Sequence, residues 1–116
     1  MQVRRGDVIE VNLDPTVGTE IQKTRRCVVV QNDTGNRVSP RTIIVPATSS
    51  ENARGKPFPI WVPVSESDGG FTKHAVVLCD QIRVIDKSRI VRACGHLSSE
   101  AMAKVDIALK ISLALK

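Results

Sequence analysis

Cationic side chains gather in one short segment of the sequence. The stretch GTEIQKTRRCVVVQND, residues 18–33, begins as a polar segment that carries Lys23, Arg25 and Arg26, and it becomes apolar at Cys27. A planar guanidinium group can donate two parallel hydrogen bonds to the oxygens of a phosphate. The segment is therefore either a solvated loop that keeps the protein soluble or a site that handles phosphate.

A second set of polar residues stands beside or within the apolar runs that predict strands. Two precede the cations in the loop, two close one apolar run, and two interrupt another: Thr19, Glu20, Thr48, Ser49, Asp80 and Gln81. A polar pair inside an apolar strand must point outward or find partners in a pocket. Spacing alone leaves open whether these groups converge.

Other kinds of catalytic site find little support in the sequence. Histidine is the usual general acid or base, but His74 stands at a predicted turn and His96 just before a predicted helix, without a triad partner beside either. We interpret both as solvated or capping residues. Cys27, Cys79 and Cys94 have no disulfide or metal-ligand spacing, and the phosphate-binding motif GxxxxGK[ST] is absent. We expect no metal site and a reduced, cytoplasmic protein.

Length and composition indicate a single globular domain over residues 1–116. Apolar residues make up 41% of the chain and charged residues 25%, which is typical of a folded rather than a disordered protein. Aromatic residues make up only 3%, so a sheet that stacks RNA bases on exposed aromatic rings is not expected. The formal charge of +5 mildly favours a polyanionic partner. No stretch has the length and apolar character of a membrane span.

Hydrophobic periodicity predicts six strands and one helix. Residues 7–13 alternate as a half-buried strand does, and the continuous apolar run at residues 27–31 suggests a strand buried on both faces. Pro46 lacks the N–H that a ladder needs, so it indicates an edge, a bulge or a strand end. Polar loops or turns are expected at residues 14–26, 32–36, 49–57 and 65–74. The other predicted strands are residues 42–48, 59–64, 75–85 and 90–93.

After residue 97 the period changes from two to that of a helix. Ser98 is the expected N-cap, and an apolar stripe follows it: Met102, Val105, Ile107, Ala108, Leu109, Ile111, Leu113 and Leu115. The stripe is wide for a surface helix, so it either packs deep against the strands or shares a partner's surface; core packing is favoured for most positions. The expected fold is mainly β (α+β), a small, partly open barrel with a C-terminal helix packed on it.

These residues carry a resemblance that extends along nearly the whole chain. In order and spacing, the following segments resemble the MazF/PemK/Kid toxins of bacterial toxin–antitoxin systems: RRGDVIEVNLDPTVGTE, VVVQNDTGNRVSP, TIIVPATS, DQIRVIDKSRI and GHLSSEAMAKVDIALKISLAL. The resemblance implies the CcdB/PemK-like fold, an SH3-like β-barrel of five to seven strands with a C-terminal α-helix, assembled as a homodimer. It also implies a cytoplasmic, sequence-specific endoribonuclease that cuts single-stranded RNA, chiefly mRNA, without a metal or other cofactor. Its other expected partner is a MazE-like antitoxin, bound through the antitoxin's acidic C-terminal segment, and no membrane is involved.

The resemblance also assigns roles to individual residues. The catalytic arginine of the family falls on Arg25, its catalytic threonine on Thr48 and its loop acid on Glu20. The acidic residue and the glutamine that line the RNA groove fall on Asp80 and Gln81. The general base stays open between Glu20 and Arg25. Further expected RNA contacts are Thr19, Lys23, Arg26 and Ser49.

One residue departs from the family pattern. Relatives usually carry Arg-Pro after the loop, whereas this chain has Arg25-Arg26. A proline would restrict the backbone of its neighbour, so Arg25 is expected to be less preorganised here, while Arg26 could add a second phosphate contact. Two alternatives therefore stand beside the ribonuclease: an attenuated or inactive RNA-binding barrel, and a CcdB-like toxin that binds DNA gyrase and cleaves nothing.

Overall fold

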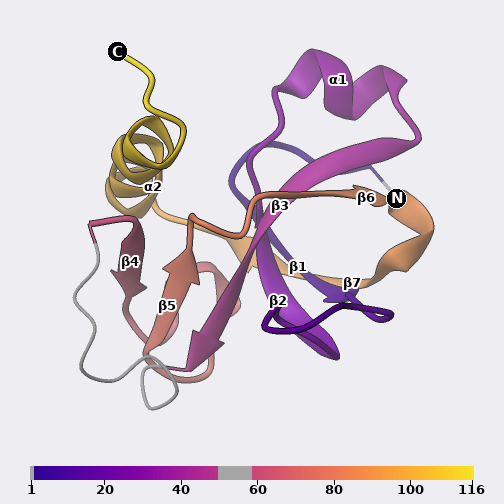
Figure 1. Cartoon of the computed structure of the whole chain (residues 1–116), viewed down its shortest axis with the longest axis horizontal. Helices are drawn as coiled ribbons and strands as arrows, with labels where there is room; N and C mark the ends of the chain where they lie inside the picture. Colours follow the sequence, from indigo (N-terminus) through magenta and orange to yellow (C-terminus); the bar gives the residue numbers. More distant parts are fainter. Residues whose placement is uncertain (1, 50–58) are drawn as a thin grey trace.

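The computed structural model describes residues 2–49 and 59–116 of the chain. Figure 1 shows the order of the elements from the N-terminus to the C-terminus. Across the described residues these elements are β1 (Asp7–Asn12), β2 (Thr24–Val29), α1 (Asp33–Val38), β3 (Arg41–Ser49), β4 (Trp61–Val64), the 3-10 turn η1 (Asp68–Gly70), β5 (Ala75–Leu78), β6 (Arg83–Asp86), the 3-10 turn η2 (Lys87–Arg89), β7 (Ile90–His96) and α2 (Ser99–Ser112).

The strands form one antiparallel sheet in the order β4-β5-β3-β2-β1-β7, with β6 also paired to β3. The first strand lies against the last, and Asp7 stands opposite His96 in that ladder. Within residues 2–49 and 59–116 no ladder joins β4 to β7. The predicted β-rich fold with a C-terminal helix is confirmed, and its sheet is curled and open rather than closed into a barrel.

Strand β3 belongs to both halves of the sheet. Its first residues pair with β6 as far as Ile44, and its last residues pair with β5 from Ala47 onward. Pro46 stands between these two ladders, and on the other side of the strand it faces Cys27 of β2. Because proline has no N–H for a ladder, a strand tolerates it where one partner has ended and the next has not begun. This position fits the expected irregularity at Pro46.

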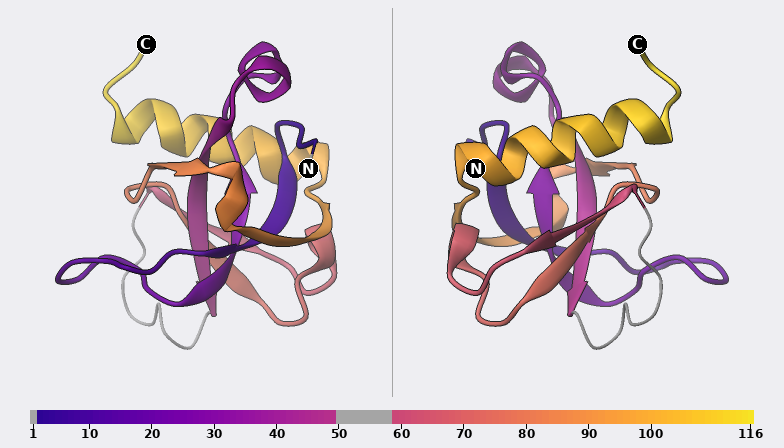
Figure 2. Two further views of the ribbon diagram at one scale, coloured as in Figure 1. Left: turned by 90° about the vertical axis from the view of Figure 1, so that its right-hand side faces the viewer. Right: turned by 90° about the vertical axis from the view of Figure 1, so that its left-hand side faces the viewer.

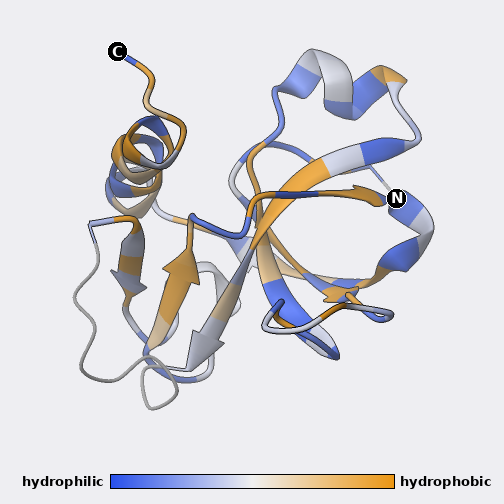
Figure 3. Cartoon of the chain, in the orientation of Figure 1, coloured by the Kyte–Doolittle hydropathy of each residue, from blue (hydrophilic) through white to orange (hydrophobic). Residues whose placement is uncertain are grey.

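The curled sheet buries apolar side chains on both faces, and Figure 3 shows the apolar residues along its strands. Successive residues point to opposite faces of a strand, so Val8 and Val28 join one core while Ile9 and Val29 join the other. The first core is completed by β4, β5 and α2, and the second by β6 and the residue Val3. The run that begins at Cys27 is thus buried on both faces, as its continuous apolar pattern predicts.

Helix α2 packs across one side of the sheet, as the two views of Figure 2 show. Ser98 caps it by accepting a hydrogen bond from the Ala101 N–H at 3.2 Å, as expected. Val105 and Ala108 are buried in the core. The expectation of core packing is wrong for four positions, which are 50% or more exposed: Ile107, Ile111, Leu113 and Leu115. The apolar stripe is wider than the strip of sheet that the helix covers. None of the described helices has the length and apolar character to cross a membrane.

Several predicted boundaries are wrong. Residues 33–38 form helix α1 instead of part of a turn, because Asn32 caps it through a 2.8 Å hydrogen bond from the Gly35 N–H. The run at residues 75–85 is two strands, since a turn with a 3.1 Å bond from Gln81 N to Leu78 O interrupts it. Strand β2 starts earlier than predicted, at Thr24, and β7 extends to His96. Residues 50–57 of the predicted polar loop lie outside the described residues.

Glycines bring the turn η1 against the backbone of β7. A side chain on Gly70 would meet the Cys94 carbonyl oxygen at 2.3 Å, and one on Gly95 would meet the Gly69 backbone at 2.7 Å. Both Gly69 and Gly70 have positive φ, at 65° and 84°, which side chains disfavour. Only glycine allows this close approach, and it fixes the start of the segment that leads from η1 into β5.

Candidate active site

Arg25 and Arg26 lie on strand β2, which corrects the expectation that they belong to the loop. The register with β1 sets Arg25 opposite Val11 and Arg26 opposite Glu10, so the two guanidinium side chains leave opposite faces of the sheet. The Arg25 Nε donates to the Gln22 carbonyl oxygen at 3.1 Å. Both arginines are therefore held in place by β2, whose following residues, Cys27 to Val29, are buried in the sheet.

Thr48 stands near the end of β3, next to β2. Cys27 of β2 faces Pro46 of β3, so two further residues along each strand bring Arg25 and Thr48 to the same face and the same end of the pair. On its other side Thr48 faces Val76 of β5, and Ser49 faces Ala75. Three adjacent strands thus contribute to one end of the sheet.

A hollow of about 180 Å³ opens at this end, and we call it the Arg25 pocket. It is lined by Thr24, Arg25, Arg26, Ala47, Thr48, Ser49, Phe71, Thr72, Lys73, His74 and Ala75. Its lining combines three permanent cations with four hydroxyl groups, and no carboxylate belongs to it among the described residues. Such a set of donors suits a phosphate group.

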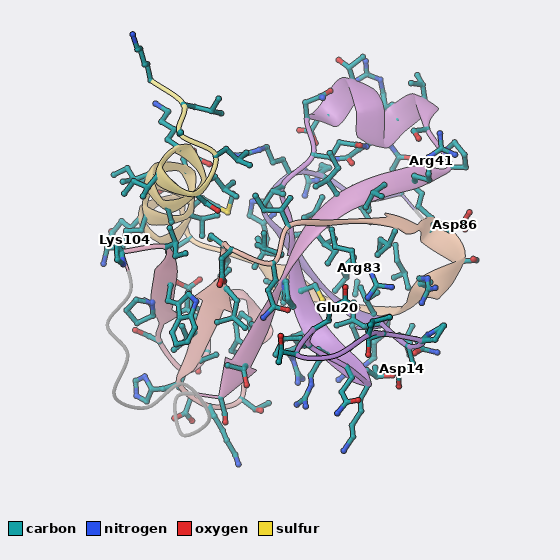
Figure 4. All side chains as sticks on the ribbon, in the orientation of Figure 1. Asp14, Glu20, Arg41, Arg83, Asp86 and Lys104 are labelled. Carbon is teal, nitrogen blue, oxygen red and sulfur yellow. The ribbon has the colours of Figure 1, made fainter. Side chains whose placement is uncertain are left out.

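A second hollow, the Glu20 pocket, has a volume of about 380 Å³. It is lined by Leu13, Thr19, Glu20, Ile21, Ile44, Pro46, Asp80, Gln81, Ile82 and Arg83. Figure 4 labels Glu20 and Arg83, which belong to this lining. Its polar lining therefore carries both signs of charge, unlike that of the Arg25 pocket.

Polar side chains of the Glu20 pocket are held by local hydrogen bonds. The Gln81 Oε1 accepts from the Ile21 N–H at 2.9 Å, which ties the loop after β1 to the turn after β5. The Asp80 Oδ1 accepts from the Trp61 Nε1 at 3.0 Å, and the Glu20 Oε1 accepts from the Val17 N–H at 2.6 Å. The prediction that Asp80 and Gln81 belong to a strand is wrong: they lie in the turn between β5 and β6.

The residues predicted from the sequence therefore divide between two pockets. Arg25, Arg26, Thr48 and Ser49 line the Arg25 pocket, whereas Thr19, Glu20, Asp80 and Gln81 line the Glu20 pocket. Lys23 lines neither; it is exposed, its φ is 71°, and its N–H donates to the Asp14 Oδ1 at 3.1 Å.

Sequence reasoning missed the segment from Phe71 to His74, which forms one wall of the Arg25 pocket. Phe71 is buried and anchors the segment. The available signal was the position of Lys73 and His74 directly before a strand that pairs with the end of β3. The sequence position alone was not enough, because the segment reaches the site only through the pairing of β3 with β5.

Arg26 takes part in a row of charges across three strands. Glu10 of β1 stands opposite Arg26 of β2 on one side and opposite Arg92 of β7 on the other, and Arg92 Nε forms an ion pair with the Glu10 carboxylate. The Arg26 Nε is buried and has no hydrogen-bond partner among the described residues. A buried donor without a partner costs free energy, so the Arg26 guanidinium gains from an incoming acceptor.

The cysteines are poor candidates for nucleophilic catalysis. Burial raises the pKa of the Cys27 thiol, and that of the Cys79 thiol, to about 12 in each case, whereas attack requires the thiolate. Both are buried. Among residues 2–49 and 59–116 no group of acidic, histidine or cysteine side chains could hold a metal ion.

Comparison with known proteins identifies the family. The family of PemK-like, MazF-like toxins of type II toxin–antitoxin systems matches residues 4–113. The chain belongs to this family. It is 46% identical over 115 residues to the Endoribonuclease EndoA of Bacillus subtilis, covering 99% of this chain and 97% of that protein.

Solved structures share the fold of this MazF-like chain. MazF from Deinococcus radiodurans matches with a TM-score of 0.83 and 25% identity, covering 99% of each chain. A mycobacterial endoribonuclease solved in complex with its cognate antitoxin matches with a TM-score of 0.80 and 23% identity, covering 98% of this chain and 97% of that one. The open sheet with its C-terminal helix is therefore the MazF architecture.

Proposed function

We propose that this MazF-like chain is the toxin of a type II toxin–antitoxin system and an endoribonuclease that cuts single-stranded RNA, chiefly mRNA, at a short preferred sequence. The observation that carries the proposal is the Arg25 pocket, which combines guanidinium and hydroxyl donors without a carboxylate among the described residues. The near full-length similarity to a named endoribonuclease supports it. A toxin that cuts mRNA acts in the cytoplasm.

RNA supplies its own nucleophile for this reaction. The 2′-oxygen attacks the adjacent phosphorus and the bond to the 5′-oxygen breaks, which leaves a 2′,3′-cyclic phosphate and a 5′-OH. Arg25 binds the phosphate oxygens through its planar fork of donors. Thr48 donates its hydroxyl to the charge that grows on the phosphate, an interaction of the oxyanion type worth about 3 kcal/mol. DNA is spared because it has no 2′-OH.

The Glu20 pocket extends the RNA-binding surface in this proposal. Glu20, Asp80 and Gln81 offer carbonyl or carboxylate acceptors beside Thr19, and such acceptors can bind the exocyclic amino groups of unstacked bases. A catalytic part for Glu20 stays a prediction. Arg26, Ser49 and Lys23 are proposed as further contacts to the RNA backbone, with Lys23 the most peripheral of the three.

The proposed protein partners are a second copy of the chain and an antitoxin. Four exposed apolar side chains on and after α2 support a protein contact at that helix. A mycobacterial endoribonuclease has been solved in complex with its cognate antitoxin, and MazF of Deinococcus radiodurans has been solved as a MazE-MazF complex. An acidic antitoxin segment would complement the net charge of +5.

The decisive experiment incubates the purified chain, with EDTA present, with a long mixed-sequence RNA and its DNA equivalent. Mapped cuts in RNA alone, ending in cyclic phosphate, are the expected result for the native chain. Arg25→Ala and Thr48→Ala should lose these cuts, while Arg37→Ala, a change on α1 outside both pockets, should keep them. Full activity in either of the first two variants would contradict the assigned site.

The same experiment separates the alternatives. Cleavage by Arg26→Pro but not by the native chain would identify an attenuated toxin. If neither chain cleaves RNA, tight RNA binding would indicate an inactive barrel, and binding of gyrase would indicate a CcdB-like toxin.

A further inference from the structure

The Arg25 pocket contains many proton donors and one evident proton acceptor. Lysine and arginine side chains carry their protons at neutral pH, and hydroxyl groups are too weakly basic to remove a proton from a sugar. These two classes account for Arg25, Arg26, Lys73 and the four hydroxyl groups of the lining. His74 is the one remaining titratable side chain among the described residues of this pocket, and imidazole exchanges protons near neutral pH.

The strand register sets His74 on the same side of the sheet as Thr48. Thr48 faces Val76 across the ladder between β3 and β5. His74 precedes Val76 by two residues, so an extended chain directs both side chains to one face. Diagonal neighbours of this kind lie about 7–8 Å apart. That is a spacing between backbone positions; both residues belong to the lining of the Arg25 pocket, to which β2, on the other side of β3, contributes Arg25.

The segment that carries His74 is fixed at both ends. Phe71 before it is 6% exposed and Ala75 after it is 5% exposed. The Phe71 carbonyl oxygen accepts from the Ser67 N–H at 2.7 Å, and the Phe71 N–H donates to the Asp68 carbonyl oxygen at 3.2 Å. The glycine contacts of η1 with β7 hold the same turn. His74 therefore lies in a short segment whose two flanking residues, Phe71 and Ala75, are buried.

The acidic residue that the sequence offers as a general base, Glu20, lies in the other pocket. Glu20 lines the Glu20 pocket and accepts a hydrogen bond from the Val17 N–H of its own loop. The charged and hydroxyl-bearing residues that line this pocket together with His74 are Thr24, Arg25 and Arg26 from β2, Thr48 and Ser49 from β3, and Thr72 and Lys73 from its own segment. These neighbours can bind the phosphate and donate protons.

We propose that His74 is the general base of the RNA cleavage, an inference that rests on the proposed ribonuclease function. The imidazole nitrogen accepts the proton of the 2′-OH while the 2′-oxygen forms its bond to phosphorus. The bond from phosphorus to the 5′-oxygen breaks, and that oxygen takes a proton from water. The imidazolium then releases its proton to solvent, which restores the enzyme and balances the hydroxide formed.

The test compares the native chain with His74→Gln, His74→Ala and Lys73→Gln on one RNA over a range of pH. General-base catalysis contributes about 10²–10⁴-fold, so His74→Gln should lose kcat/KM by that factor. The fall in rate on the acid side of the native profile should disappear in both His74 variants. Added imidazole should restore part of the activity of His74→Ala.

Two controls separate proton transfer from binding and folding. Binding of an RNA that is 2′-O-methylated at the cleavage site should be unchanged in His74→Gln, and circular dichroism should match the native chain. Lys73→Gln should weaken binding while keeping the acid limb of the profile, because it removes only a charge.

The outcomes keep this inference distinct from the proposed function. If the native chain cleaves RNA, Arg25→Ala does not, and His74→Gln keeps the native rate and acid limb, the function stands and His74 is not the base. His74 is also not the base if the loss of rate in its variants comes entirely from weaker RNA binding. If the native chain cleaves nothing, both proposals fail.

Discussion

The Arg25 pocket and the Glu20 pocket share one strand but differ in chemistry. The end of β3 contributes Ala47, Thr48 and Ser49 to the first, and its middle contributes Ile44 and Pro46 to the second. The first combines cations, hydroxyl groups and one imidazole, whereas the second combines carboxylates, an amide and Arg83. A phosphate is common to every nucleotide and a base is not. This difference favours bond cleavage in the first pocket and sequence preference in the second.

The largest expected effect comes from Arg25, on the cleavage side of the comparison. Arg25→Ala should lower kcat/KM by about 10³-fold, the upper range for removing a preorganised donor. Arg25→Lys should recover little of it, because an ammonium group lacks the planar fork that binds two phosphate oxygens. Single-turnover cleavage of one RNA measures both variants. A lysine variant with native activity would show that charge alone suffices.

Thr48 should give the next largest effect. Thr48→Val keeps the shape of the side chain but removes the hydroxyl, so kcat should fall about 10²-fold while RNA affinity changes little. Thr48→Ser, which keeps the hydroxyl, is the matched control and should retain most of the activity. An equal loss in the serine and valine variants would point to packing instead of a hydrogen bond to the phosphate.

The Glu20 pocket should change where RNA is cut more than how fast. Asp80→Asn replaces an acceptor by a group that also donates, and losing one hydrogen bond of about 1.4 kcal/mol corresponds to about tenfold at the preferred sequence. Mapping all cuts in a long RNA should show new sites in this variant. If the cleavage rate falls equally at every site and the sequence preference is unchanged, the Glu20 pocket does not set the sequence preference.

Arg26 should have a smaller effect, visible mainly in the salt dependence. Arg26 lines the Arg25 pocket, and its buried Nε has no partner among the residues that the structure describes, so we expect a phosphate contact. Arg26→Gln should reduce the slope of log affinity against log salt by about 0.7, the value for one contact to single-stranded nucleic acid. Arg37→Gln is a matched control, since Arg37 lies on α1 outside both pockets; an identical slope change there would indicate a general charge effect.

Asp33 lies on α1, outside both pockets, so we expect its substitution to change stability and not cleavage. Hydrogen bonds from the Arg5 N–H and the Asn36 side chain hold the pKa of the Asp33 carboxyl below its ordinary value of 3.8. A lowered pKa in the folded state contributes stability at pH values above the ordinary pKa, and this contribution is lost as the pH falls through the folded-state pKa. Asp33→Asn should therefore lower the urea midpoint at pH 7, with the difference shrinking in acid. A difference that grows in acid would contradict this assignment.

Local sequence patterns predicted the fold better than the grouping of the site. Alternation in β1 and the apolar run after Cys27 follow from burial, which acts residue by residue, and so they could be predicted. The two pockets depend on the register of β3 against β2 and β5, which no local pattern encodes. For that reason the spacing left open whether Glu20 and Arg25 converge, although the family resemblance names both as catalytic, and His74 was interpreted as a solvated or capping residue. The break at Asp80-Gln81 was missed because apolar residues stand on both sides of it, Val77 to Cys79 before it and Ile82, Val84 and Ile85 after it, and together they resemble one continuous strand.

The pairing of β1 with β7 has a consequence for synthesis on the ribosome. Asp7 meets its ladder partner His96 only after the residues between them have been made. At about 5–20 residues per second, the outer edge of β1 waits roughly 4 to 18 s for that partner. During this time its unpaired N–H and C=O groups are open to other strands or to chaperones. Completion of the sheet, and with it a firmly held η1, therefore waits until β7 has been synthesised.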